Sequence, residues 1–507
     1  MKNSSRIVVN TGILYGKMFL NMGIALFSTR LILKALGTND FGIFAIVGGV
    51  IGALSFLNKA MSTATQRFLS YNQGKGPEQV ARVFNTALLL HVFIGLAFVL
   101  ILEIAGVFLF DGFLNIAEDR IPMAKFVFHC TVASTFFTVI AVPYDAIMNA
   151  KENMFIFSLF SVLESIFKLV IAVLLFYTPV DRLATYGLCM ALMTVFCRTI
   201  KRIYSRRKYK ESKLNFQIID WSLMKEMLSY SSWITIEIVS HIAKGDGIPV
   251  ILNLFFGTVV NASYGIATQV RHSISLFAEM LFKASNPQVM RNIGDGNIDK
   301  SVQLSTTVCK FSYILMAILS LPLIIDCEYI LRFWLGKVPE YSVIFCQLVL
   351  ATQLVIMTAR GLNFLIDGVG KIRNYRLILS VLNIIVFPIA YICLKVGMEP
   401  WAVFFGIVLS DILVVVVRVY FAHKYTGMNI WHFCRSSILR FVPLTLIVGV
   451  IVHRVQELIQ VEPFLNLIIC SIISTALLIC GFYIFVLDSN ERKYTKELIQ
   501  KVRKKLG

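Results

Sequence analysis

The stretch FGTVVNASYGIA, residues 256–267, has an earlier counterpart in LGTNDFGIFA, residues 36–45. Each copy begins with an apolar residue and Gly-Thr and runs on to an aromatic residue followed by Gly-Ile. A further match follows each copy, YNQGKG at 71–76 and RNIGDG at 291–296, so the loop glycines keep their order with one three-residue gap. A repeat with a period of about 220 residues indicates two structural copies in one chain.

The composition of the 507-residue chain excludes a soluble protein, because 57% of the residues are apolar and only 15% are charged. A membrane-spanning helix needs about 20 mostly apolar residues, and runs of that length follow one another along the chain. Transmembrane strands would be about 10 residues of alternating polarity, so we expect helices. The sequence predicts an all-α integral membrane protein with about 14 transmembrane helices. They are expected at 7–33, 41–66, 82–110, 122–143, 154–177, 183–203, 228–254, 260–285, 302–326, 341–366, 374–396, 400–422, 437–456 and 464–487.

The repeat aligns the first two predicted helices with the seventh and eighth. Six helices separate the starts of the copies, and an even number makes both copies enter the membrane in the same direction. We therefore expect two parallel-repeat six-helix lobes around a central cavity, followed by two extra C-terminal helices. The predicted domains are an N-lobe at 1–215, a C-lobe at 216–425, and helices thirteen and fourteen with a basic tail at 426–507.

The formal net charge of +19 is concentrated in loops on one side of the predicted membrane. That side holds the basic run at 198–213, KIRNYR at 371–376 and the tail at 491–507. Cytoplasmic loops carry an excess of Lys and Arg, so both termini are predicted to be cytoplasmic. The charge is attributed to topology and to contact with anionic membrane lipids, and no nucleic-acid partner is expected.

Several kinds of chemistry are not expected from this sequence. The loops are too short for a catalytic or ATP-binding domain, and no Gly-Lys pair is followed by the Ser or Thr of a phosphate-binding loop. The stretch at 295–299 has the opening spacing of a calcium loop, but Thr306 stands where a bidentate Glu is needed. The ten cysteines are scattered singly and predict neither a disulfide framework nor a metal site. The protein is therefore not expected to be an enzyme or to hold a cofactor or metal, and an ion gradient or the substrate's own gradient would drive transport.

Polar residues form stripes along the two pairs of repeated helices. Such residues are costly in hydrocarbon and normally face the bundle or a water-filled cavity. At 100° per residue the stripes fall on one face of each helix. Their members are Asn10, Lys17, Asn21 and Ser28; Ser55, Asn58, Lys59, Ser62 and Gln66; Tyr230, Glu237, His241 and Lys244; and Tyr264, Thr268, Arg271, His272, Ser275, Glu279 and Asn286. Hydrogen bonding between helices is the alternative interpretation for Ser, Thr and Asn, whereas a full charge needs water or a partner.

The seventh predicted helix contains the run HIAKGDGIPVILNLFFG at 241–257. Gly245, Gly247 and Pro249 predict an interruption, which survives in a membrane only where it lines a cavity or a protein interior. Asp246 would bind a cation or a proton there, and a packing kink is the alternative.

Other ionisable groups in the spans are weaker candidates. Glu164 and Lys168 are spaced for mutual neutralisation on the fifth helix. Asp411, His91 and His129 stand alone in their helices, and each is a minor candidate for coupling.

Asp246, a run of aliphatic residues, Gly257 and YGIA at 264–267 resemble the signature between helices seven and eight of bacterial polysaccharide transporters. These are the lipid-linked oligosaccharide flippases of O-antigen and exopolysaccharide export. RLILKALGTNDFGIF at 30–44 resembles the same family's signature between helices one and two. The family belongs to the superfamily that also contains multidrug and toxin extrusion antiporters and lipid II flippases. The resemblance covers essentially the whole chain.

The resemblance implies a flippase that exports an undecaprenyl-diphosphate-linked oligosaccharide across a bacterial inner membrane by alternating access. The oligosaccharide would be a repeat unit of O-antigen, capsule or exopolysaccharide, and a polysaccharide polymerase machinery is a candidate partner. The resemblance also implies a cationic cavity, here with Lys17, Asn21, Asn58, Gln66, Lys244, Arg271 and His272 as substrate residues. Candidates for coupling to a proton or sodium ion are Glu237, His241, Asp246 and Glu279. The carboxylates share faces with the cations, so the expected charge of this cavity is nearly balanced.

Three alternatives remain open at this point. A cation-coupled multidrug exporter fits a twelve-helix core but not helices thirteen and fourteen. A lipid II flippase would share the fold and the type of substrate. A membrane polysaccharide polymerase or ligase would need a large outward loop with catalytic Arg or His, and the sequence contains no such loop.

Overall fold

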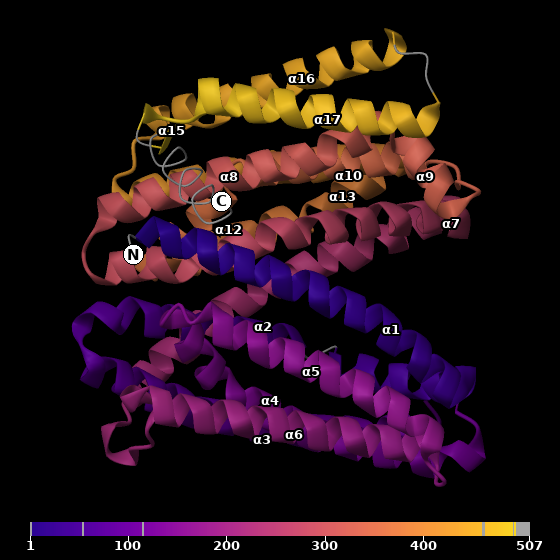
Figure 1. The fold of residues 1–507 in the computed structure, drawn as a ribbon, viewed down its shortest axis with the longest axis vertical. Coiled ribbons are helices and arrows are strands. Elements are labelled where there is room, and N and C mark those ends of the chain that lie inside the picture. The colour runs from indigo at the N-terminus through magenta and orange to yellow at the C-terminus, as the bar shows by residue number, and fades with distance from the viewer. Residues whose placement is uncertain (1–2, 53–54, 114–115, 459–461, 490, 493–507) are drawn as a thin grey trace, which may run out of the picture. The chain divides into compact units, whose positions relative to one another are not determined.

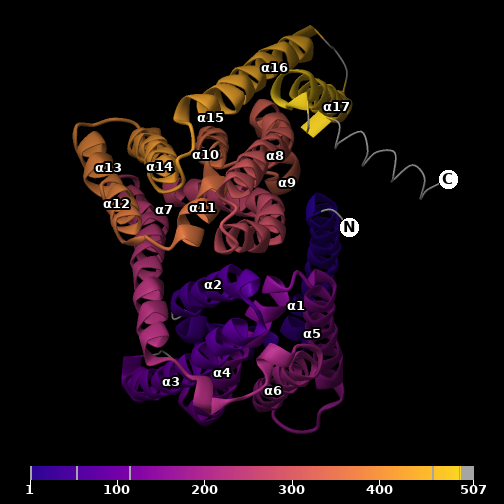
Figure 2. The same ribbon diagram turned by 90° about the vertical axis from the view of Figure 1, so that its left-hand side faces the viewer.

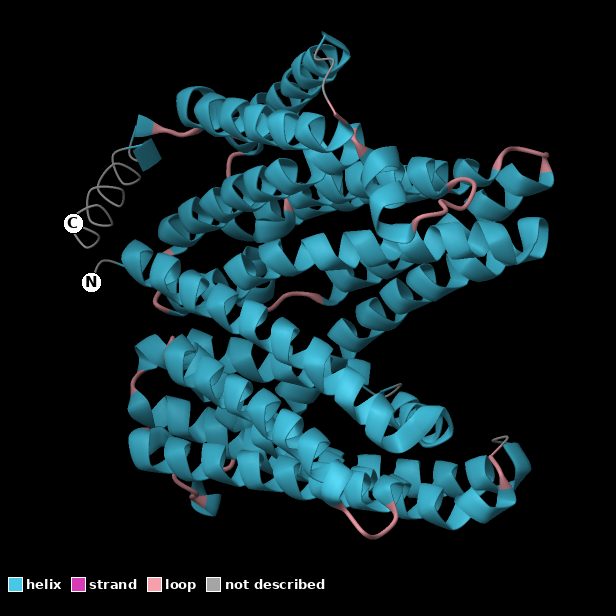
Figure 3. Ribbon diagram, turned by 45° about the vertical axis from the view of Figure 1, so that its right-hand side comes forward, coloured by secondary structure: helices cyan, strands magenta, loops and turns pink. Residues whose placement is uncertain are grey.

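The computed structural model describes residues 3–52, 55–113, 116–458, 462–489 and 491–492. Within these ranges every regular element is a helix (Figure 3). Contacts divide the chain into two compact units. The N-unit comprises residues 8–235, and the C-unit comprises residues 236–507 together with 1–7. This division falls inside a helix, and the expected domain boundary between residues 215 and 216 stays a prediction.

The N-unit is built around a long central helix, α4, which packs against α2, α3 and α6 (Figure 1). Two glycines explain the close packing. A Cβ on Gly106 of α3 would lie 2.5 Å from the Phe128 ring of α4, and one on Gly187 of α6 would lie 2.7 Å from Val127. The helices are α1 (Asn3–Gly52), α2 (Ser55–Tyr71), α3 (Pro77–Phe108), α4 (Ile121–Ala150), α5 (Met154–Leu174), α6 (Arg182–Lys208) and the start of α7 (Trp221–Gly294), with short turns η1 (Asn72–Lys75), η2 (Leu109–Phe113), η3 (Glu118–Arg120), η4 (Leu175–Tyr177), η5 (Lys210–Ser212) and η6 (Phe216–Ile218).

The C-unit contains the rest of α7 and all later helices (Figure 2). These are α8 (Ile298–Ile325), α9 (Cys327–Leu335), α10 (Ser342–Met357), α11 (Asn363–Val369), α12 (Arg373–Ile384), α13 (Val386–Lys395), α14 (Val403–Thr426), α15 (Ile430–Ser436), α16 (Ile438–Leu458) and α17 (Pro463–Gly481), with η7 (Arg360–Leu362), η8 (Pro400–Ala402) and η9 (Phe482–Val486). The last two long helices, α16 and α17, lie side by side and pack against α8. Phe441 and Leu478 are fully buried in a core that they share with Met316 of α8, so these helices are an integral part of the C-unit.

The repeat is visible in the backbone at Gly37 and Gly257, which interrupt α1 and α7. Gly37 has φ 78° and ψ 172°, and Gly257 has φ 78° and ψ −163°. Residues with a side chain rarely adopt this conformation, so glycine is required at both positions. Each copy of the quoted motif therefore forms the same unit, a helix, a sharp break and a second helix.

Ten helices in the described part of the chain are long and apolar enough to cross a membrane. The count is eleven if α10 and the η7–α11 segment, bent by 45°, form one span. The protein is therefore a multi-pass membrane protein, but the expected number of fourteen is not confirmed. The seventh and eighth expected spans are helical, and their polar stripes lower their hydropathy, whereas the second expected span includes residues 53–54, which lie outside the described ranges.

The predicted interruption of the seventh helix at Gly245–Pro249 is wrong. The chain stays helical through this stretch, and the break comes later, at Gly257. Pro249 lies inside this continuous helix, where it removes one backbone hydrogen-bond donor without ending the helix. Gly247 has a packing role, since a Cβ there would lie 2.3 Å from the Phe387 ring of α13.

Candidate functional site

Each unit contains a cluster of charged side chains on which several of its helices converge. The N-unit cluster consists of Lys17 of α1, Asp145 of α4, Glu164 of α5, and Arg198 and Lys201 of α6. Lys201 is almost completely buried, and its Nζ lies 3.3 Å from Asp145 Oδ1 and 3.1 Å from Glu164 Oε1. Arg198 adds an ion pair of 3.0 Å to Glu164. Five charges from four helices thus converge in one place.

The expected neutralisation of Glu164 by Lys168 is wrong, because the Glu164 carboxylate pairs with α6 instead. Arg198 and Lys201 lie three residues apart, so both project from one face of α6. A contact between two packed helices is shielded from water, whereas a pair along a single helix surface is not. The packing of α5 on α6 therefore determines the partner of Glu164.

Lys17 is the cation of the N-unit cluster that lies outside its ion pairs. Its Nζ lies 4.7 Å from the centroid of the Phe157 ring, and the Nζ of Lys201 lies 5.9 Å from the same ring. The ring face attracts both ammonium groups. Among the described residues Lys17 forms no salt bridge, although it is near enough to Glu164 and Asp145 to interact electrostatically. The cluster has three cations and two carboxylates, so one positive charge is in excess.

The other candidates on the first two helices have mainly structural contacts. Asn21 donates to Ser161 Oγ of α5 at 3.0 Å and accepts from Ser165 Oγ at 3.2 Å. The stripe on the first helix therefore faces α5. Asn58 Oδ1 is buried and has no hydrogen-bond partner in the described structure, and Gln66 is half-buried. A substrate role for these residues stays a prediction.

The C-unit cluster contains nine charged side chains. They are Glu237 and Lys244 in the first half of α7, Arg271 and Glu279 in its second half, Arg360 of η7, Asp367 of α11, Arg376 of α12, and Asp411 and Arg418 of α14. Five are cations and four are carboxylates, so this cluster also has one positive charge in excess.

Lys244 and Asp411 form a buried ion pair, with Lys244 Nζ 2.9 Å from Asp411 Oδ1. Ser410 Oγ lies 3.4 Å from the same ammonium group. The side chains are 15% and 5% exposed. The interpretation of Asp411 as an isolated group is therefore wrong. Lys244 is neutralised by a partner 167 residues away, which reduces its availability to an anionic substrate.

Arg376 joins two carboxylates in the interior of the C-unit. It lies 2.9 Å from Glu237 Oε2 through one nitrogen and contacts Asp367 through another. Nearby, Asn383 donates to Ser240 Oγ at 3.1 Å, so α12 and α7 are held together by polar contacts. The bidentate use of a planar guanidinium makes Arg376 a fixed counter-ion of Glu237.

Arg418, which is 8% exposed, and Arg271, which is half-buried, are the two cations of the C-unit cluster without an ion pair to a described residue, and Arg271 is the more accessible. It is close enough to Asp411 and Tyr264 for electrostatic interaction. Glu279 has a distant partner, since Arg360 lies 3.8 Å away, and the Glu279 side chain is 47% exposed. Arg418 donates to the Ile356 carbonyl at 3.4 Å. Arg271 is thus the residue of this cluster best placed to attract an anion.

Three further candidates have exposed side chains, namely His241, Asp246 and His272. None of them forms a hydrogen bond or ion pair within the described ranges, although His241 is close enough to Glu237 and Lys244 for electrostatic interaction. Their assignment to substrate binding or ion coupling stays a prediction. The described residues contain no group of three or more His, Cys, Asp and Glu side chains that suits a metal ion.

Sequence reasoning missed Arg198, Lys201, Arg360, Asp367, Arg376 and Arg418. Arg376 was counted among the basic loop residues that set the topology, although its side chain is buried. A usable signal existed in α14, where Arg418 follows Asp411 by seven residues in an otherwise apolar run and so lies on the same helix face.

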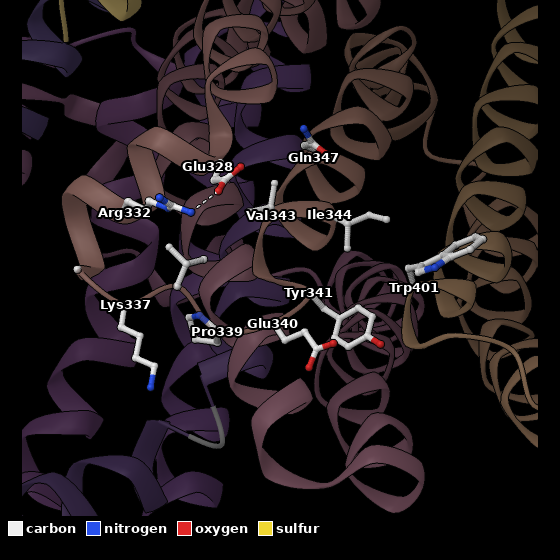
Figure 4. A pocket seen from close by; sticks show the side chains of 12 residues that line it. Glu328, Arg332, Lys337, Pro339, Glu340, Tyr341, Val343, Ile344, Gln347 and Trp401 are labelled. Atoms are coloured by element: carbon white, nitrogen blue, oxygen red, sulfur yellow. Dashed lines mark hydrogen bonds and ion pairs between the residues drawn. The ribbon is translucent and has the colours of Figure 1, made fainter. Parts of the chain in front are cut away.

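A separate cavity of about 790 Å³ lies at one end of the C-unit (Figure 4). Its walls include Glu328 and Arg332 of α9, Val343 and Gln347 of α10, and Trp401 of η8. No residue of the two charged clusters lines it. This hollow is therefore distinct from the two charged clusters.

The fold is similar to that of solved transporters, whereas no protein-family model and no curated protein matches the sequence. A mutant MATE crystal structure aligns with a TM-score of 0.74 and 13% identity, over 84% of this chain and 97% of that one. An outward-facing multidrug resistance MATE family transporter of the MOP superfamily aligns with a TM-score of 0.69 and 13% identity, over 84% of this chain and 98% of that one. A MOP superfamily transporter from Pyrococcus furiosus, described as having a binding pocket of reverse polarity, aligns with a TM-score of 0.69 and 15% identity, over 85% of this chain and 97% of that one. The chain thus has the fold of MATE transporters.

Proposed function

We propose that the protein is a flippase that moves an undecaprenyl-diphosphate-linked oligosaccharide from the inner to the outer leaflet of a bacterial cytoplasmic membrane. The observation that carries this proposal is the charged interior of both units, each with one cation in excess. A diphosphate is doubly or more negatively charged, and Lys and Arg are the side chains that bind it. Lys17 and Arg271, the half-buried cations outside ion pairs, are assigned to the diphosphate.

The two extra helices add a second line of support. The solved MATE proteins are covered almost completely by the alignment, yet they match only 84% of this chain. The unmatched share is about as long as residues 426–507, which contain α16 and α17. Helices thirteen and fourteen distinguish the predicted flippase from a twelve-helix drug exporter.

The proposed mechanism is alternating access. The charged head group cannot enter hydrocarbon, because an unpaired charge there is very costly. It therefore occupies a water-filled cavity while its lipid tail stays in the bilayer, and the protein opens first to one side and then to the other. Binding of a proton or sodium ion biases this equilibrium if the two states differ in affinity for it.

The contacts refine the choice of coupling residue. Glu237 is neutralised by the fixed guanidinium of Arg376, whereas Asp246 is exposed and Glu279 has only a distant partner. We therefore assign coupling to Asp246 or Glu279 in preference to Glu237.

A reconstituted flipping assay tests the proposal. Purified protein is placed in vesicles with an undecaprenyl-diphosphate-linked oligosaccharide that carries a fluorophore on its sugar, and impermeant dithionite reports the pool in the outer leaflet. Arg271→Ala and Lys17→Ala should each slow flipping about tenfold or more, because a hydrogen bond to a charged group contributes about 1.5–3 kcal/mol. Arg271→Lys should keep part of the activity, since it retains the charge.

Arg291→Ala is the matched control. Arg291 lies in the same helix, is 47% exposed and pairs only with Asp295 at 3.8 Å, so its loss should leave flipping unchanged. Wild-type rates in both the Arg271→Ala and the Lys17→Ala variants would contradict the proposal.

A multidrug exporter is the second candidate, because one of the structural neighbours is described as a multidrug resistance transporter. Ethidium efflux from cells that produce the protein separates the two functions. The flippase proposal expects no efflux above that of cells lacking the protein. Robust efflux together with absent flipping would contradict the flippase proposal and support a multidrug exporter.

A further inference from the structure

Two buried cysteines meet at the end of the C-unit where the large cavity lies. Cys327 is the first residue of α9, and Cys346 lies in the second turn of α10. Their thiols lie close enough together for each to affect the ionisation of the other. Independently, Cys327 Sγ lies 3.7 Å from the carbonyl oxygen of Val343, one turn before Cys346. Both belong to one buried core and are only 3% and 1% exposed.

The charge distribution places this end of the C-unit outside the cytoplasm. The segment at 326–341 follows the ninth predicted helix, on the side opposite the basic loops at 198–213 and 371–376. Disulfides form and persist outside the cytoplasm, where thiol oxidants act. Two cysteines packed in one buried core in such a compartment are a disulfide precursor.

We propose that Cys327 and Cys346 are joined by a disulfide bond in the mature protein. The oxidant is a dithiol-disulfide exchange protein of the compartment outside the cytoplasmic membrane. The thiolate of one cysteine attacks the oxidant's disulfide and forms a mixed disulfide, and the other cysteine then displaces the oxidant as a dithiol. The cysteine pair loses two electrons, the oxidant gains them, and the two thiol protons end on the oxidant's thiols.

The burial of both sulfurs sets the order of events. An oxidant cannot reach thiols that are 3% and 1% exposed, so exchange takes place before α9 packs onto α10. Once formed, the bond is shielded from reductants for the same reason. It is thus a structural cross-link made during folding.

The bond would fix the two walls of the cavity to each other. The neighbour of Cys327 in sequence, Glu328, lines one wall, and the neighbour of Cys346, Gln347, lines the other (Figure 4). The enclosed loop contains two residues with positive φ, Gly336 at 72° and Tyr341 at 66°. A cross-link at its base limits the conformations of this loop in the unfolded chain and so favours the folded one.

Counting free thiols tests the proposal on the full chain. Cells that produce the protein are quenched in acid, and the denatured protein is treated with a mass-tagged maleimide before or after reduction. We expect two fewer tags than the ten cysteines without reductant, and all ten after reduction. Peptide mapping should identify the 327–346 link. Ten tags without reductant, or a link to another cysteine, would overturn the proposal.

Two variants and one strain complete the experiment. Cys327→Ser should abolish the gain of tags on reduction, whereas Cys309→Ser, which removes another buried thiol, should preserve a gain of two. In cells that lack the thiol oxidant the link should be absent, and its persistence there would overturn the exchange route. The readout is independent of transport, so the flippase proposal and the disulfide proposal succeed or fail separately.

Discussion

At the scale of single residues, the sequence located the charged interior but not its pairing. Lys17, Lys244 and Arg271 stand out in apolar runs, where a charge is costly and signals a polar environment. Their partners come from tertiary packing, however, and Lys244 finds Asp411 on a helix 167 residues away. Sequence spacing instead suggested Glu164 with Lys168, a pair that the structure replaces. Neighbours along one helix are predictable, and neighbours across helices are not.

The Lys244–Asp411 pair leads to a prediction about stability. Asp411→Asn should strongly lower the unfolding temperature, because it leaves a buried ammonium group without its counter-ion, which typically costs about 3–5 kcal/mol. Replacing both residues, as Lys244→Met with Asp411→Leu, should recover most of the loss, since two apolar groups need no partner. Thermal unfolding in detergent measures both effects. An Asp411→Asn protein as stable as the wild type would show that Lys244 is solvated and available to a substrate.

At the scale of elements, the repeat matched the two glycines at which the helices break, and the structure adds a tie to a neighbouring loop in each copy. When the copies are aligned, Asp40 occupies the position of Ser263, each directly before the aromatic residue. Arg120, in the loop between α3 and α4, donates from Nε to Asp40 at 3.0 Å. Ser263 donates to the Glu340 carbonyl in the corresponding loop of the C-unit. In both copies the start of the second helix is thus bonded to the equivalent loop. The N-unit uses an ion pair between side chains, and the C-unit uses a hydrogen bond from a side chain to a backbone carbonyl.

The break at Gly257 was visible in the sequence as a matched glycine, yet Gly245 and Gly247 drew the prediction to the wrong place. Gly257→Ala should destabilise the protein by about 1–3 kcal/mol, because its φ of 78° is unfavourable for alanine. Gly265→Ala is the matched control on the same helix, with open space around the new methyl group. It should be neutral or stabilising by up to about 1 kcal/mol. Thermal unfolding of the two variants decides whether the break or the mere presence of glycine matters.

Asp181 precedes α6, accepts a hydrogen bond from the Ala184 amide and pairs with Arg120. The contribution of this carboxylate to stability depends on pH. Burial alone would raise the pKa of Asp181, but hydrogen bonds from the Ala184 amide and the Arg120 guanidinium outweigh it and hold the pKa below its ordinary value of 3.8. The ionised form is thus favoured in the folded state, and its stabilising contribution is complete above pH 3.8. It is lost as the pH falls through the lowered pKa.

Asp181→Asn should remove this contribution while keeping a side chain that caps the helix. The variant should be less stable than the wild type at neutral pH, and the difference in unfolding temperature should shrink as the pH falls below about 3.8. Asp119→Asn, at an exposed position in the preceding loop, should show no such difference. A constant difference between Asp181→Asn and the wild type across this range would disprove the role of the charge.

At the scale of the whole molecule, the open question is how often the chain crosses the membrane. Ten or eleven helices pass on length and hydropathy, and fourteen were expected from the sequence. The difference lies in the second, seventh and eighth helices. The second includes residues 53–54, which lie outside the described ranges, whereas the seventh and eighth carry polar stripes that lower their mean hydropathy. An even number places both termini on one side, and an odd number places them on opposite sides.

Single cysteines in a cysteine-free background resolve the second helix. Asn39 and Lys75 flank it, and both side chains are exposed. If the helix crosses the membrane, an impermeant maleimide applied to intact cells should label Asn39→Cys, and should label Lys75→Cys only after permeabilisation. A fluorescent protein fused to the C-terminus should then fluoresce, because fourteen crossings bring that end back to the cytoplasm. Labelling of both cysteines from outside would remove the second helix from the membrane, and with it the assignment of Asn58 and Gln66 to a transport pathway.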